Sequence, residues 1–267
     1  MRRTGPDTGP VYRPGAIASM IAAAAFVALV GAWVVGGGTI SLPWAPTLGL
    51  RLEFALDGFA IVYALLATGI GLLVFGYGAA YLPAHLAHER RPASDARRFW
   101  PWMVLFMGAM VGLAMARDLV LLFVFFDLTA VASYFLIGFD RHRAEARGAA
   151  FMALLVTGSS AVAMLLGAVL LQVEYGTFLL PELFERANPS GVTTAASMLI
   201  VLAALAKSAQ APLHFWLPRA MEAPTPVSAY LHSAAMVAAG VLVIGRVHPL
   251  LALDPVVGWW RARAGAG

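Results

Sequence analysis

Seven stretches of mainly apolar residues follow one another along this chain. A helix needs roughly 20 apolar residues to cross the hydrocarbon core of a bilayer, and it satisfies its own backbone groups in lipid. The stretches are Ala16–Val35, Leu56–Leu82, Pro101–Ala116, Leu119–Phe139, Gly148–Leu171, Ala195–Ala211 and Pro226–Gly245. They predict an all-α polytopic membrane bundle of about seven transmembrane helices, forming a single transmembrane domain over residues 1–267.

Composition supports this class. Hydrophobic residues make up 61% of the chain and charged residues only 12%, which is far from the balance of a soluble domain. The chain has no cysteine, so it offers neither a disulfide nor a thiolate metal site. Its net charge of +4 is spread over the loops, which excludes the basic face of a nucleic-acid-binding domain. A signal peptide is the alternative for the first run, but its length favours a retained helix.

The arginines are distributed unevenly between the two sides of the predicted bundle. With seven spans, the side of the N-terminus carries eleven arginines and the opposite side six. The first set is Arg2, Arg3, Arg13, Arg90, Arg91, Arg97, Arg98, Arg141, Arg143, Arg147 and Arg219, and the second is Arg51, Arg117, Arg186, Arg246, Arg261 and Arg263. Because cytoplasmic loops carry the excess of basic residues, we expect the N-terminus in the cytoplasm of a bacterial plasma membrane.

Lys207 is the only lysine of the chain and lies inside an apolar run. Arginine keeps its proton under all ordinary conditions, whereas a desolvated lysine can release it. An ionisable group in a membrane span indicates a functional site, although a lysine near a helix end could also reach the interface. Pro212 predicts a break about one turn after the lysine, and Gln210 and His214 would share its face if the helix continued. Broken helices are common at ion sites of transporters.

Two further ionisable residues fall within apolar runs. Asp127 is a costly charge at membrane depth, about 3 kcal/mol on insertion scales, so we expect a partner, and Lys207 is the buried cation available. The alternative is that Asp127 hydrogen-bonds locally to Thr129 and Ser133. His232 has an ordinary pKa of about 6.5 that suits a proton relay, although it could be a packing residue. No role is assigned to His85, His88, His142 and His248, which fall in loops or at span ends.

The loops carry weaker signals. Residues 36–55 contain a glycine run, Pro43, Trp44 and Pro46, which predicts an interfacial segment anchored by Trp44. Residues 171–194 carry three glutamates, and we expect a short surface helix there.

These motifs together resemble the antiporter-like subunits shared by Mrp-type multisubunit sodium/proton antiporters and the proton-pumping membrane arm of respiratory complex I. The resemblance lies in Asp57-Gly58, the segment 68–74, Leu119–Phe139, Lys207–Gly240 and Gly245-Arg246. The phrases at 105–110, 214–218 and 223–233 are more similar to the large Mrp A subunit than to the complex I homologue.

The resemblance implies a buried proton path through an acid, a lysine on a broken helix and a histidine on the next helix. Carried onto this chain, these are Asp127, Lys207 and His232, with His214 beside the break. The family usually has glutamate where Asp127 stands, so the pair must close differently or through water. The chain also has Ala238 in place of a lysine found in Mrp A, and Ala161 in place of an acid found in complex I.

The resemblance also implies a larger assembly. The family fold has about fourteen helices with two inverted five-helix repeats, and this chain corresponds to roughly the first half without the first helix. We expect either a fragment or a natural split, with another chain supplying the second half-channel. The implied partners are other hydrophobic subunits, protons and a monovalent cation such as sodium.

Three other functions stay open at this point. The chain could be a pumping subunit of a redox-driven, complex I-like enzyme, although nothing in it would bind NADH, quinone or an iron–sulfur cluster. It could belong to an inorganic-carbon uptake complex with the same fold. It could also be a scaffold that conducts nothing. We therefore expect a transporter subunit that binds no cofactor or metal and is not an enzyme by itself.

Overall fold

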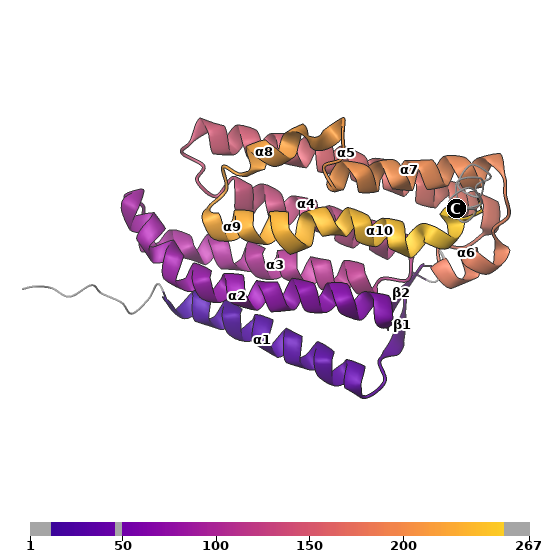
Figure 1. The fold of residues 1–267 in the computed structure, drawn as a ribbon, viewed down its shortest axis with the longest axis horizontal. Coiled ribbons are helices and arrows are strands. Elements are labelled where there is room, and N and C mark those ends of the chain that lie inside the picture. Colours follow the sequence, from indigo (N-terminus) through magenta and orange to yellow (C-terminus); the bar gives the residue numbers. More distant parts are fainter. Residues whose placement is uncertain (1–11, 46–49, 254–267) are drawn as a thin grey trace, which may run out of the picture.

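The computed structural model describes residues 12–45 and 50–253 and shows a bundle of helices lying side by side along its long axis (Figure 1). Its main elements are α1 (Tyr12–Val34), β1 (Gly38–Ala45), β2 (Leu50–Leu56), α2 (Gly58–His88), α3 (Ala96–Met115), α4 (Leu119–Ile137), α5 (Ala144–Tyr175), α6 (Leu180–Arg186), α7 (Gly191–Lys207), α8 (Trp216–Ala220), α9 (Thr225–Tyr230) and α10 (Met236–Leu251). Short 3-10 turns, Ala93–Asp95 and Leu213–Phe215, precede α3 and α8.

The helices pack mainly against their neighbours in sequence, with two exceptions that build the centre. Helix α5 packs against both α4 and α7, and α10 returns to pack against α7. Helix α1 lies at the rim against α2 (Figure 1). Only 11% of the most apolar stretch of α1 is buried, compared with 50% for α4. The outer helix therefore presents most of its apolar surface outward, and the inner ones enclose the candidate site.

Two aspartates define where central helices begin. The carboxylate of Asp57 accepts a hydrogen bond from the amide of Ala60 at 2.8 Å and starts α2. The carboxylate of Asp118 accepts from the amides of Val120 and Leu121 at 2.7 and 3.1 Å and starts α4. Such caps satisfy amides that have no partner inside the helix. This explains how two residues between the third and fourth apolar runs suffice to separate two antiparallel helices.

The predicted bundle is confirmed. Within the described residues, five helices are long and apolar enough to cross a membrane, and two shorter apolar helices, α7 and α10, accompany them. The observed helices extend into polar sequence beyond the predicted runs, most clearly α2, which continues to His88, and α5, which begins at Ala144. Hydropathy marks only the lipid-exposed part of a helix, so the predicted boundaries were too short there.

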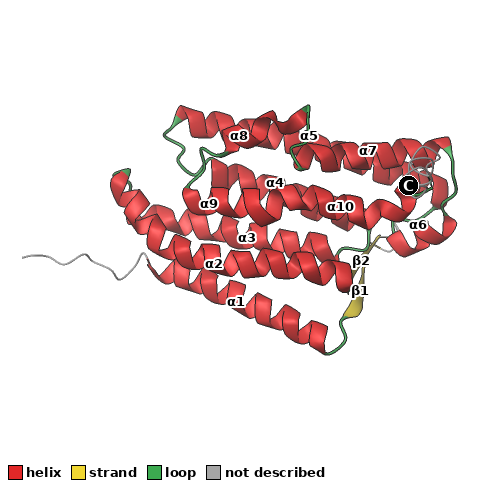
Figure 2. Ribbon diagram, viewed as in Figure 1, coloured by secondary structure: helices red, strands yellow, loops and turns green. Residues whose placement is uncertain are grey.

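The segment before α2 has regular structure that the sequence analysis did not predict. Strands β1 and β2 form an antiparallel pair at the end of the bundle (Figure 2), and the interfacial position expected for this segment stays a prediction. Ile40, Leu42 and Trp44 alternate along β1, each more than half exposed. This alternation is a strand signal that the sequence interpretation did not use. The surface helix predicted in residues 171–194 is present as α6.

Several residues of the sequence argument lie outside the described part of the chain. They are Arg2, Arg3, Pro46, Arg261 and Arg263.

Candidate functional site

The centre of the bundle holds a helix that ends at a lysine. Helix α7 stops at Lys207, where the amides of Ala209 and Gln210 turn back to the carbonyls of Ala206 and Leu205 at 3.1 and 2.9 Å. Ala209 has a φ of 51°, in the left-handed region that closes helices and favours glycine. An alanine in that conformation is strained, so the surrounding packing must hold this helix end in place.

The break occurs earlier than the sequence indicated. The apolar run was expected to continue as helix to Ala211, with the break caused by Pro212, but the chain leaves the helix about one turn sooner. The segment then passes through a 3-10 turn into α8. Gln210 and His214 therefore do not continue the helical face of Lys207. His214 is exposed on the connecting segment.

Neighbouring groups close the end of α7. The indole nitrogen of Trp216 donates to the carbonyl of Ala206 at 3.0 Å, and the hydroxyl of Ser208 donates to the carbonyl of Val237 in α10 at 2.9 Å. Gly240 faces the Ala204 carbonyl and the Ser208 hydroxyl so closely that a methyl group there would collide with both. The glycine thus lets α10 approach the broken helix, and the freed backbone groups are satisfied within the protein.

Lys207 is fully buried, with 0% of its surface exposed. Its Nζ donates a hydrogen bond to the carbonyl of Phe126 in α4 at 2.6 Å and lies 4.1 Å from the centroid of the Phe126 ring. The hydroxyl of Thr129 donates to the same carbonyl at 2.7 Å. A carbonyl dipole and an aromatic face both favour a cation, but neither carries the full negative charge that a buried ammonium usually needs.

Asp127 is the next residue along α4 and is only partly buried. The ion pairs of the described residues, taken to 4.0 Å, include none between Asp127 and Lys207. The direct pair expected from sequence is therefore absent from the described structure, and Asp127 lies near enough to Lys207 for a Coulomb attraction. The local alternative is also wrong, because the hydroxyls of Thr129 and Ser133 donate to backbone carbonyls instead.

His232 lies in an irregular part of the last helix. Residues Leu231–Ala235 form a π-helical turn between α9 and α10, a distortion that is frequent at functional sites. Both ring nitrogens are buried, and neither has a hydrogen-bond partner of good geometry in the part of the chain described. The carbonyl of Ala220 faces the ring. A buried imidazole can accept or donate a proton when water or a moving side chain reaches it.

The structure reveals a second ionic group that the sequence interpretation missed. Asp140, which follows α4, is 2% exposed and accepts hydrogen bonds from His85 Nε2 at 3.0 Å and from Arg91 at 2.5 Å. The other nitrogen of His85 meets the hydroxyl of Tyr81 at 3.3 Å. His85 and Asp140 are 55 residues apart, so no local pattern joins them. In the described residues, no cluster of three or more His, Asp or Glu side chains could hold a metal ion.

A comparison with known proteins assigns the chain to a family. The family model described as NADH:quinone oxidoreductase/Mrp antiporter, TM, matches residues 116–263, which include the broken helix and all four predicted site residues. The chain belongs to this family. The antiporter-like resemblance seen in the sequence is thereby confirmed, and the chain is an integral membrane protein of that class.

Members of the family with similar sequences are antiporter subunits. The A subunit of the Na(+)/H(+) antiporter of Alkalihalophilus pseudofirmus is 41% identical over 221 residues, covering 81% of this chain and 27% of that protein. The A/B subunit of a probable K(+)/H(+) antiporter of Rhizobium meliloti is 40% identical over 255 residues, covering 91% and 24%. The solved Mrp complex from Dietzia sp. DQ12-45-1b contains a chain with a TM-score of 0.75 and 33% identity, covering 89% of this chain and 27% of that one. This chain thus spans about a quarter of the length of these relatives.

Proposed function

We propose that this chain forms a proton-conducting part of the large subunit of an Mrp-type monovalent cation/proton antiporter. The observation that carries the proposal is Lys207, a fully buried lysine at the end of a broken helix, with no carboxylate in direct contact in the described structure. Burial disfavours the charged ammonium, whereas the carbonyl and the aromatic ring favour it. Because these two effects oppose each other, small structural changes nearby can change the protonation state of the lysine.

The proposed path begins with competition for the proton of Lys207. When the Phe126 carbonyl and the charge of Asp127 face the amine, they favour the charged form. If the end of α7 moves away from α4, this attraction weakens while burial remains, and the amine releases its proton. The strained turn at Ala209 makes the end of α7 the natural place for such a movement.

We propose His232 as the next proton carrier and His214 as a group at the mouth of the path. Helix α7, which ends at Lys207, packs against α10, and Ser208 donates to Val237 there. His232 lies in the π-helical turn directly before α10. The buried ring of His232 keeps a nitrogen that can exchange a proton through water, because the Ala220 carbonyl can engage only one of the two. His214 is exposed in this chain, and it would gain a role only where further parts of the antiporter cover the segment between α7 and α8.

The proposal includes membrane topology and partners. Residues 1–267 would form one transmembrane domain that crosses the membrane seven times, with the N-terminus in the cytoplasm. Other hydrophobic subunits would assemble with it, and a further chain segment would supply the second half-channel. Sodium is the proposed cation. Purifying the tagged chain in mild detergent and identifying its companions by mass spectrometry tests the assembly, since flavin or iron–sulfur subunits would indicate a redox-driven pump.

Replacing the lysine tests the proton path. In the assembled complex, Lys207→Ala should abolish cation-dependent proton movement across inverted membrane vesicles, while the amount of co-purifying complex stays unchanged. Lys207→Arg should also fail, because it keeps the charge but cannot release the proton. Full exchange in Lys207→Ala would support the non-conducting scaffold instead. Activity in Lys207→Arg would mean that charge alone is required.

A further inference from the structure

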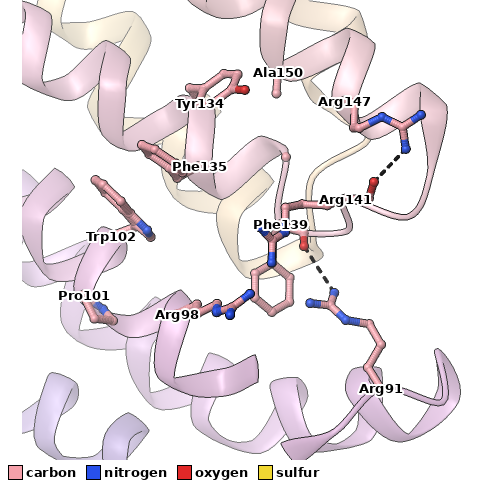
Figure 3. Close-up of a pocket in the computed structure, with 11 residues that line it drawn as sticks. Arg91, Arg98, Pro101, Trp102, Tyr134, Phe135, Phe139, Arg141, Arg147 and Ala150 are labelled. Carbon is pink, nitrogen blue, oxygen red and sulfur yellow. Dashed lines mark hydrogen bonds between the residues drawn. The ribbon is translucent and has the colours of Figure 1, made fainter. Parts of the chain in front are cut away.

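A cavity of about 530 Å³ opens at the arginine-rich end of the bundle, between α3, α4 and α5 (Figure 3). It lies away from Lys207. Its lining has two chemically different parts. Arginine side chains, Arg91, Arg98, Arg141 and Arg147, surround one part, and aromatic side chains, including Trp102 and Phe135, form the other. No aspartate or glutamate lines it.

Three of the four guanidinium groups lack a carboxylate partner in the described structure. Arg91 is paired with Asp95 and Asp140. By contrast, Arg147 donates only to backbone carbonyls, one of them that of Arg141 at 2.7 Å (Figure 3), and neither Arg98 nor Arg141 makes an ion pair within the described residues.

Arg98, Arg141 and Arg147 are exposed at the mouth of the cavity, so water hydrates them. Three like charges gathered around one cavity nevertheless raise the local positive potential and attract an anion. Guanidinium groups match phosphate oxygens in a two-pronged geometry, which a single ammonium cannot reproduce. The charge of the cavity therefore indicates a phosphate-bearing ligand.

The aromatic wall determines what the rest of that ligand must be. Trp102 and Phe135 stack with ring centroids 3.9 Å apart and an angle of 11°, and Phe135 is 43% exposed. Trp102 follows Arg98 by one helical turn, so the surface changes from charged to aromatic within a short distance along the helix. Tryptophan is enriched where headgroups meet acyl chains. A ligand that is anionic at one end and apolar at the other fits both parts.

We propose that this cavity binds an anionic phospholipid, with its phosphate between Arg98, Arg141 and Arg147 and an acyl chain along Trp102 and Phe135. Basic cavities between membrane helices on the cytoplasmic side are known to suit acidic lipid headgroups. The arginine excess predicts that this end of the bundle lies on that side, in line with the proposed topology. We expect a lipid with a net negative charge to bind better than a zwitterionic one. In a zwitterionic headgroup the phosphate charge is balanced by the headgroup's own cation, so it offers less attraction to three guanidinium groups. This inference does not depend on the proton path.

Lipid retention in the purified complex tests the proposal. The variant Arg98→Gln/Arg141→Gln/Arg147→Gln is compared with Arg90→Gln/Arg97→Gln/Arg219→Gln, which removes the same charge from the same end but outside the cavity. After detergent exchange, phosphatidylglycerol bound per complex should fall at least about tenfold in the first variant and stay near wild type in the second. Equal losses in both would overturn a specific site.

Three further arms identify the ligand. Phosphatidylglycerol should raise the melting temperature of the wild-type complex, and phosphatidylcholine and inorganic phosphate should not. An equal shift with phosphatidylcholine would overturn the charge requirement, and an equal shift with phosphate would overturn the lipid. Trp102→Ala, which leaves the charge intact, should also reduce retention. A photo-crosslinker placed at Phe135 should capture lipid, and capture of a neighbouring subunit would mean that this face is a protein contact.

Discussion

Two of the aspartates in or beside α4, Asp140 and Asp127, have opposite environments. Asp140, just beyond the end of the helix, is saturated by His85 and Arg91. Asp127, in the middle of the same helix, has no direct ionic partner in the described structure, although the fully buried Lys207 lies close enough to feel its charge. One carboxylate has all its partners in a network beyond the end of α4, and the other, in the middle of the helix, has no direct ionic partner among the described residues.

This difference distinguishes a carboxylate that stabilises the fold from one that can respond to changes in protonation or position nearby. A buried group with all its partners made resists change, because any rearrangement leaves a desolvated charge behind. A group held only by distant attraction can respond when a neighbour moves or gains a proton. We therefore expect mutation of Asp140 to lower stability and mutation of Asp127 to lower transport.

The largest stability effect is expected at the saturated carboxylate. Asp140→Ala should destabilise the complex by about 3 kcal/mol, because it leaves Arg91 and His85 without their shared partner. Transport per folded complex should stay near wild type. Thermal unfolding and vesicle transport measure the two quantities. Asp95→Ala is the matched control, since it removes the more exposed partner of Arg91 and should cost less. Lost transport with unchanged stability would reverse the assignment.

The incomplete carboxylate should give the opposite result. Asp127→Asn should lower transport on the order of tenfold or more, because it removes the Coulomb attraction that favours the charged form of Lys207. Its melting temperature should not fall. Asp127→Glu, which adds one methylene toward Lys207, should retain most of the transport. If both variants transport equally well, the Coulomb coupling inferred for Asp127 is wrong.

The strained end of α7 offers a smaller effect. Ala209→Gly should stabilise the complex by about 1 kcal/mol, since glycine adopts a φ of 51° without the steric cost of a methyl group. Ala206→Gly, inside the same helix, is the control and should destabilise by about the same amount. Thermal unfolding of both variants decides the point. Destabilisation by Ala209→Gly would mean that the alanine side chain contributes packing that outweighs its strain.

The smallest effect concerns an ion pair at the opposite end of the bundle, where Arg246 donates to Asp57 at 2.6 Å. Burial alone would raise the pKa of Asp57, but the hydrogen bonds from Arg246 and from the Ala60 amide, together with the nearby arginine charges, outweigh it and hold the pKa below its ordinary 3.8. Because the folded pKa is lowered, the stabilisation exists above about 3.8 and disappears as the pH falls through the folded pKa.

Asp57→Asn should therefore lower the melting temperature slightly at pH 7, by less than about 1 kcal/mol for this half-exposed carboxylate. The difference from wild type should shrink as the pH falls below 3.8 and through the lowered pKa of the folded state. Asparagine at this position can still cap α2, so the variant tests the charge of Asp57 and not the cap. A melting-temperature difference that does not change with pH would mean that this charge does not contribute to stability.

Much of the architecture could be predicted because it depends on local sequence. Long apolar runs predict membrane helices wherever they occur, and the polar pair Arg117–Asp118 marked the boundary between α3 and α4. The boundaries were less accurate at His88 and Ala144, where helices continue past the lipid on polar residues. The β-hairpin was missed because the alternation of Ile40, Leu42 and Trp44 is short and every one of these side chains is exposed.

The sequence predicted individual residues of the site but not the contacts between them. The single lysine and the membrane-depth aspartate stood out by chemistry, because charged groups are rare in apolar runs. The early end of α7 was missed because it results from the backbone turn at Ala209 and not from the proline. The Asp140 network was also missed, since its members come from separate helices.

The sequence by itself determined a membrane bundle with one lysine, one aspartate and one histidine at membrane depth, because hydropathy and residue chemistry are properties of the chain. Only the tertiary structure decided which groups meet. The hydrogen bond from Lys207 to the Phe126 carbonyl joins residues 81 positions apart, and the arginine cavity gathers side chains from three helices. Such contacts depend on how helices rotate and pack against one another, and that geometry is set by the bundle as a whole.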